Sequence, residues 1–255
     1  MSYRQRLEAP LMTAALIAAC ASPGQFEQTP DDKKAARINV QLGAAYLERG
    51  DLQTASVKLE RALREDYSLA TAHWTYALLQ LRLGRPKLAE KHFREAVALN
   101  PADSRAHNNY GTFLCDASRL AEAQAQFTRA LKNPHYDQPE TALTNAGICA
   151  LRAPDNIKAE AYFHKALDKN PEFAPAVYEM ARLSYEQKRY TQTQAYLKQY
   201  KRIGGDTAGT LWLAWQTETQ LGNRNAADNY AAQLKQRYPE SPETARLLQK
   251  EHNGS

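Results

Sequence analysis

The sequence repeats itself with a period of 34 residues, and this repeat constrains the fold more than any other feature. In four successive units a small residue is followed by an alanine twelve positions later and by a bulky Leu or Phe four positions after that. Because a period of this length is typical of stacked helical units, the chain is predicted to be an array rather than a single compact core. The small residues are Gly43, Ala77, Gly111, Gly147 and Ala181, separated by 34, 34, 36 and 34 residues, and the bulky ones are Leu59, Phe93, Phe127 and Phe163.

These are the positions that define the tetratricopeptide repeat. Two antiparallel helices pack closely only where side chains are small, and the Leu or Phe fills the gap between them. Asn-Pro pairs at 100–101, 133–134 and 170–171 end a helix, because proline cannot continue one and restricts the residue before it. We therefore predict an all-α, right-handed tetratricopeptide solenoid of six helix-turn-helix units, at residues 36–69, 70–103, 104–137, 140–173, 174–207 and 208–241.

The end of the array is less regular. The fifth unit has Thr193 and Tyr200 where alanine is expected, and Gly204 and Gly205 near its end, so the pattern does not define its helix lengths. Residues 242–255 are predicted to be a cap and tail, with a short polar helix at 242–251. The reason is that the last unit of a solenoid needs a wettable outer face.

The amino terminus has the features of a targeting segment. Arg4 and Arg6 precede a short apolar run at 9–19, and the run ends in Ile17-Ala18-Ala19-Cys20, which resembles the bacterial lipobox. The resemblance implies that residues 1–19 are a lipoprotein signal peptide and that Cys20 is lipidated, with Ala21 implying sorting to the periplasmic face of the outer membrane. An ordinary signal peptide or a buried helix is the alternative. Residues 20–35 mix Pro, Gly and polar groups, so we predict a flexible tether there.

The sequence contains no motif of a common enzyme class: no P-loop, dinucleotide-binding, zinc-protease, nucleophile-elbow or EF-hand pattern occurs. The six histidines lack the spacing of metal ligands, so we predict no metal and no cofactor. The net charge of +5 would permit a nucleic-acid partner, but basic and acidic residues alternate, as at 87–91. We therefore predict a non-enzymatic protein that does not bind nucleic acid.

Two of the three cysteines fall in neighbouring units. Cys115 and Cys149 lie in the first helices of units three and four, and such helices are neighbours in a tetratricopeptide stack. If the chain is exported, an oxidising compartment would allow a disulfide between them. The alternative is a pair of small buried thiols packed between the helices.

A partner-binding groove is predicted on the concave face, which the first helices of the units line. In units one and two its positions are apolar and include a tryptophan, a residue favoured in binding hot spots. Asparagines at these positions in unit three could hydrogen-bond an extended segment. The alternatives are that the apolar residues are inter-repeat core or are covered by the chain itself. The predicted groove comprises Val40, Ala44, Leu47, Trp74, Leu78, Leu81, Asn108 and Asn109.

The combination of a lipobox, a tether, six repeats and the run His107-Asn-Asn-Tyr-Gly-Thr-Phe-Leu114 resembles the type IV pilus biogenesis and stability lipoproteins, the PilF/PilW pilotins. This resemblance implies an outer-membrane lipoprotein that binds secretin subunits and promotes their localisation and multimerisation in the outer membrane, and hence pilus biogenesis. The paired cysteines also resemble those of the neisserial members. A tetratricopeptide adaptor of another envelope complex, or a cytoplasmic co-chaperone, is the alternative function.

Overall fold

The computed structural model describes residues 29–253, and every regular element in that range is an α-helix. Six antiparallel pairs follow one another, and one further helix follows the last pair, so the six predicted helix-turn-helix units are confirmed. The pairs are α1 (Pro30–Glu48) and α2 (Leu52–Glu65), α3 (Ala70–Arg82) and α4 (Pro86–Leu99), α5 (Ser104–Asp116) and α6 (Leu120–Leu131), α7 (Pro139–Arg152) and α8 (Asn156–Lys169), α9 (Ala174–Glu186) and α10 (Tyr190–Gly204), and α11 (Ala208–Gln220) and α12 (Arg224–Arg237); the last helix is α13 (Pro242–Asn253).

Contact between a small residue and a large one holds the pairs α1–α2, α5–α6 and α7–α8 together. A Cβ atom added to Gly147 would lie 2.5 Å from Cε1 of Phe163, and one added to Gly111 would lie 2.8 Å from Cε1 of Phe127. Both phenylalanine rings are 0% exposed. The glycines therefore let the two helices approach until the ring of one rests on the backbone of the other, as the repeat pattern predicts.

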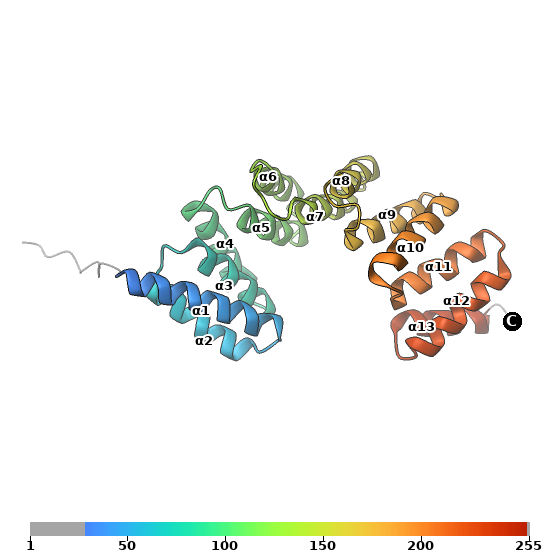
Figure 1. The fold of residues 1–255 in the computed structure, drawn as a ribbon, viewed down its shortest axis with the longest axis horizontal. Helices are drawn as coiled ribbons and strands as arrows, with labels where there is room; N and C mark the ends of the chain where they lie inside the picture. The colour runs from blue at the N-terminus through green and yellow to red at the C-terminus, as the bar shows by residue number, and fades with distance from the viewer. Residues whose placement is uncertain (1–28, 254–255) are drawn as a thin grey trace, which may run out of the picture.

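The pairs are arranged in chain order along an arch that runs from α1 at one end to α13 at the other (Figure 1). The first helix of each pair contacts the first helix of the next pair, from α1 with α3 to α9 with α11. The backbones of neighbouring second helices lie farther apart, although a side-chain hydrogen bond from Gln124 on α6 to the hydroxyl of Tyr162 on α8 bridges one such gap. Because the first helices are closer together, they line the inner side of the curve, and the second helices form the outer side.

The start of the first helix corrects the predicted tether. Helix α1 begins at Pro30, so residues 30–35 are helical and are not part of a tether. Thr29 and Asp32 form a capping box, and the proline stands in the first turn, where its missing N–H costs nothing. The lipobox, Cys20 and the rest of the tether lie outside the described residues. Within residues 29–253, no helix combines the length and hydropathy that a membrane span requires.

Helix α13 lies where the sequence predicts a cap. Its Leu247 is fully buried and joins a core cluster with Leu211 and Leu234. The hydroxyl of Thr244 donates to the carbonyl of Tyr238 at 2.7 Å. Exposed positions of the helix carry charged and polar residues such as Arg246 and Gln249. The helix thus closes the apolar end of the stack and presents a wettable surface.

A buried pair of histidines lies between α3 and α4. The Nδ1 atoms of His73 and His92 are 3.1 Å apart, and Nε2 of His73 donates to the carbonyl of Tyr67 at 2.7 Å. Burial, followed by the neighbouring His73 and Lys91, lowers the pKa of His92 from 6.5 to about 4. The pKa of His73 is also lowered by burial, although the Tyr67 carbonyl and the carboxylates of Glu95 and Asp66 oppose the shift. Both rings are therefore neutral in the folded protein at pH 7.

We expect this pair to make the protein less stable in mild acid. A histidine with a lowered pKa binds protons in the unfolded chain before it does so in the folded one, so its stabilising effect is present above pH 6.5 and is lost as the pH falls toward 4. The loss for His92 amounts to roughly 3 kcal/mol of unfolding free energy. Urea unfolding at a series of pH values measures it.

The next unit supplies the control variant. There His107 pairs through Nδ1 with Gln126 at 2.6 Å, and its Nε2 donates to the carbonyl of Pro101, as His73 does to Tyr67. His92→Gln copies this pair and removes one titrating group. The variant should lose clearly less stability between pH 6.5 and 4 than the unmodified chain. Equal losses in the two proteins would show that the His92 ring does not control the acid response.

Candidate functional site

Two of the predicted groove residues belong to the core instead. Val40 and Leu47 are 9% and 8% exposed. Val40 packs with Ala62 and Ala72, and Leu47 packs in the cluster that contains Leu59. The reason is that α1 contacts both α2 and α3, so these positions point into the junction between helices and away from the open surface.

The other apolar groove residues keep part of their surface. Ala44, Trp74, Leu78 and Leu81 are each half-buried. Trp74, Leu78 and Leu81 pack against the core cluster that contains Phe93 and Phe113. The indole Nε1 of Trp74 is buried and forms no hydrogen bond. The inner surface of the first two units is thus apolar, but it is smaller than the sequence pattern predicted.

A second apolar surface lies at the amino-terminal end of the stack, and the sequence analysis did not identify it. Ile38 and Leu42, one helical turn apart on α1, are 48% and 40% exposed. We call these two residues the N-terminal stacking face. In the later units the equivalent positions are covered by the preceding pair, as Ala106 and Tyr110 show at 0% and 5% exposed.

A signal for this face is present in the sequence. The third position of the unit is alanine in units two to five, where the slot between stacked pairs admits only a small side chain. Ile38 would not fit that slot, and no pair precedes it within the described residues. A bulky apolar residue at a position that is otherwise small therefore marks an open end of the stack.

The helix that carries the polar residues of the predicted groove forms a hydrogen bond and an ion pair with a neighbouring helix of the same chain. Asn108 is 6% exposed, and its Oδ1 accepts a hydrogen bond from Nδ2 of Asn145 at 3.1 Å. Asn109 is half-buried. At the far end of the same helices, Arg152 forms an ion pair with Asp116 at 2.6 Å. Asn108 therefore ties α5 to α7, and its oxygen is engaged in that contact.

The two cysteines of units three and four form a disulfide. Cys115 and Cys149 lie on α5 and α7, and their Cα atoms are 5.8 Å apart. Both residues are buried, at 4% and 5% exposed. The bond joins the first helices of units three and four, so it holds α5 and α7 together in the middle of the array. Of the two possibilities that the sequence left open, the structure has the bridged one.

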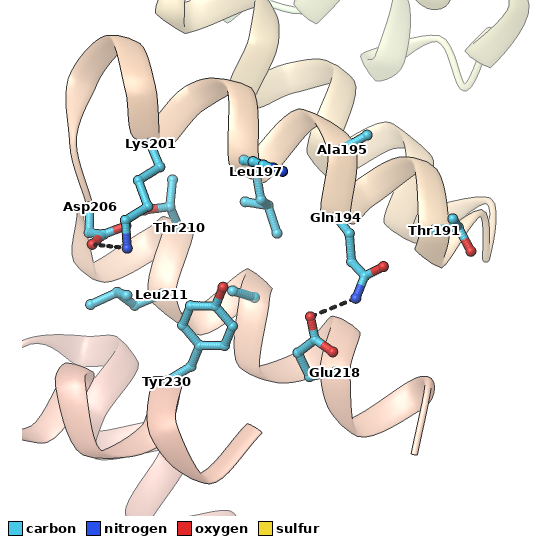
Figure 2. Close-up of a pocket in the computed structure, with 12 residues that line it drawn as sticks. Thr191, Gln194, Ala195, Leu197, Lys201, Asp206, Thr210, Leu211, Glu218 and Tyr230 are labelled. Carbon is cyan, nitrogen blue, oxygen red and sulfur yellow. Dashed lines mark hydrogen bonds and ion pairs between the residues drawn. The ribbon is translucent and has the colours of Figure 1, made fainter. Parts of the chain in front are cut away.

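A cavity of about 460 Å³ lies between α10, α11 and α12, at the junction of units five and six (Figure 2). We call it the α10–α11 cavity. Its apolar wall includes Leu197, Leu211 and Ala214. Ion-paired Lys201 and Asp206 stand at one end, and Glu218 with Gln194 stands at the other (Figure 2). The sequence analysis did not predict this site.

Comparison with known proteins bears on what these surfaces do. Tetratricopeptide repeat models match residues 40–104, 77–134 and 150–212. The type IV pilus assembly protein PilF of Pseudomonas aeruginosa is 32% identical over 230 residues, which cover 89% of this chain and 91% of that protein. The chain belongs to the PilF/PilW family. The resemblance that the sequence pattern indicated is therefore confirmed.

Solved structures of the PilF/PilW family share the fold over most of the chain. The structure of Pseudomonas aeruginosa pilF is 31% identical, with a TM-score of 0.76, and the match covers 86% of this chain and 99% of that one. PilW, a widely conserved type IV pilus biogenesis factor, is 34% identical with a TM-score of 0.77 over 84% of this chain and 98% of that one. The likeness thus extends through nearly the whole helical array.

This member of the PilF/PilW family has two separate candidate binding surfaces. The N-terminal stacking face lies on α1, and the α10–α11 cavity lies near the other end of the arch (Figure 1). In the described part of the chain, no group of three or more His, Cys, Asp or Glu side chains could hold a metal ion. The two surfaces can therefore be tested independently, since no residue is common to both.

Proposed function

We propose that this chain is a pilotin: an outer-membrane lipoprotein that binds the type IV pilus secretin and promotes its localisation and multimerisation. Membership of the PilF/PilW family carries the proposal, because relatives of this family are a type IV pilus assembly protein and a type IV pilus biogenesis factor. The tetratricopeptide array supports it as a scaffold for holding another polypeptide. In this proposal, the acyl chains on Cys20 anchor the protein in the outer membrane, and the helical array binds the secretin.

We assign the secretin contact to the first two units. Ile38 and Leu42 expose apolar side chains at an end of the stack where a further helical pair would otherwise bury them. Trp74, Leu78 and Leu81 are half-buried residues of α3, and they extend the apolar surface onto the inner side of that helix. Burying such side chains against a partner removes apolar area from water, which is the main favourable term in protein association.

The experiment compares variants in cells that lack the chromosomal gene. Ile38→Glu with Leu42→Glu places two charges on the N-terminal stacking face, and Val57→Glu on α2 is the control, because Val57 is also exposed, at 57%. Secretin multimers are measured in outer-membrane fractions. The double variant should stay in the outer membrane and lower the multimer content at least about tenfold, whereas the control should not.

A third variant tests whether lipidation of Cys20 localises the protein to the outer membrane. Cys20→Ser removes the thiol that would be acylated, so both the chain and the secretin should leave the outer-membrane fraction. Normal secretin multimers in cells carrying Cys20→Ser would refute the pilotin role. Normal multimers with the double glutamate variant would refute the assignment of the contact to α1.

A further inference from the structure

The α10–α11 cavity is lined by residues at which the fifth unit departs from the repeat. Where the second helices of units two to four carry a phenylalanine, α10 carries the smaller Leu197. Four residues later the other units have an apolar residue packed against the core, and α10 has Lys201. Those apolar equivalents are Leu63, Val97, Leu131 and Leu167. The hollow at the equivalent junction of units three and four is lined by Leu131 where this cavity has Lys201, so the two differ in their polar groups.

The two ends of the cavity differ in their balance of charge. At one end, Asp206 pairs with Lys201 at 3.2 Å and with Arg237 at 3.0 Å, so its charge is compensated. At the other end, Glu218 is only 7% exposed. Its partners there are the neutral amides of Gln194 and Asn223, each at 2.7 Å from a carboxylate oxygen. Among the described residues, no ion pair to Glu218 accompanies these two amide bonds.

Glu218 also has bonding capacity that the amides do not use. The two amide bonds go to different oxygens, Oε1 and Oε2, and each carboxylate oxygen can accept a second hydrogen bond. The hydroxyl of Tyr230 points into the same cavity and offers a further acceptor (Figure 2). A cationic ligand with several N–H donors would satisfy the acceptors at this end.

We propose that the α10–α11 cavity binds the side chain of an arginine that a partner polypeptide presents. A guanidinium carries five N–H donors in a planar fork, so it can donate to both oxygens of Glu218 and to the hydroxyl of Tyr230. The aliphatic stem of the arginine would lie along Leu197, Leu211 and Ala214. Of the two lysines that line the cavity, Lys201 is paired with Asp206, and Lys198 has an exposed side chain that solvent screens.

This inference does not depend on what the N-terminal stacking face binds. The cavity has the volume and the mixture of apolar wall and few polar groups that are common in binding sites. Its ligand is recognised by charge complementarity to Glu218. The site would thus give the protein a second contact, near the end of the array opposite α1.

The test is a titration of the full-length chain with N-acetyl-arginine amide, followed by methyl NMR. The matched probe is N-acetyl-citrulline amide, which has nearly the same shape and no charge. The methyl signals of Leu197, Leu211 and Ala214 should shift saturably with the arginine probe, while those of Leu143, in a separate hollow, stay in place. The citrulline probe should bind at least about tenfold more weakly, because a charge-assisted bond becomes a neutral one.

Three variants test whether the arginine probe binds in the α10–α11 cavity and whether Glu218 causes its preference over citrulline. Glu218→Gln should abolish the preference for arginine over citrulline, whereas Glu240→Gln, the same change of charge at an exposed site, should preserve it. Leu197→Phe restores the residue of units two to four, fills the cavity and should abolish binding while the remaining methyl spectrum shows an intact fold. Ile38→Glu with Leu42→Glu should leave the arginine titration unchanged.

Three outcomes would overturn the proposal. The first is the absence of a saturable shift at the cavity methyls with the arginine probe. The second is equal binding of the arginine and citrulline probes to the unmodified chain. The third is an arginine preference that survives in Glu218→Gln. Failure of the secretin experiment has no bearing on these results, because none of the variants in that experiment touches the cavity.

Discussion

Phe163→Ala lowers the free energy of unfolding by about 4 kcal/mol, the expected cost of truncating a buried phenylalanine. The ring is 0% exposed, and it rests on the backbone at Gly147. Glycine has no side chain that could move into the space, so the cavity cannot collapse easily. Urea unfolding of the full-length chain, followed by circular dichroism, measures the change.

Ile157→Ala is the matched control for this prediction. Ile157 is a large apolar residue on the same helix, α8, but it is 86% exposed. Its truncation removes almost no packing, so the stability should stay within about 0.5 kcal/mol of the unmodified chain. If the two variants unfolded at the same urea concentration, the small-to-large contact would not be what holds the pair together.

Loss of the disulfide should cost about 3 to 4 kcal/mol of unfolding free energy. The bond between Cys115 and Cys149 closes a loop over a sequence separation of 34 residues, and it limits the conformations open to the unfolded chain. It also joins α5 directly to α7, so its loss should loosen the stacking of units three and four. Urea unfolding with and without a reductant measures the difference.

The double variant Cys115→Ala with Cys149→Ala controls for effects of the reductant itself. It should match the reduced chain within about 1 kcal/mol, because alanine fits a buried site made for a small side chain. It should also be insensitive to reductant. An unmodified chain with the same stability in oxidising and reducing buffer would contradict the contribution assigned to this bond.

The repeat pattern predicted most of the fold because the interactions that define a unit are close in sequence. Gly111 meets Phe127 within the same helix pair, and the boundaries of that pair follow from the spacing alone. The start of α1 was placed too late because its capping box at Thr29 and Asp32 lies among polar residues with no apolar periodicity. The pairing of Cys115 and Cys149 needed the distance between α5 and α7, which the sequence left open.

The repeat pattern predicts the exposed residues of the candidate site less well than the fold, because exposure depends on which other helices lie nearby. Val40 and Ile38 are both branched apolar residues on α1, yet Val40 is covered by α2 and α3 while Ile38 is 48% exposed. A residue's position in the repeat defines its direction from the helix but not whether another helix lies in that direction. The repeat pattern does not predict the α10–α11 cavity, because its lining comes from three helices and from a loop residue, Asp206, whose relative placement the spacing does not define.

The repeat in the sequence specifies a series of six helix pairs, and in the first four it also sets a small residue against a large one, because that complementarity operates within a few turns of chain. The three-dimensional arrangement of the described residues settles which apolar residues stay exposed and which groups surround the carboxylate of Glu218. Exposure and charge balance are sums over all neighbours in space, and at the end of a stack or at an irregular junction those neighbours differ from the ones that the repeat implies.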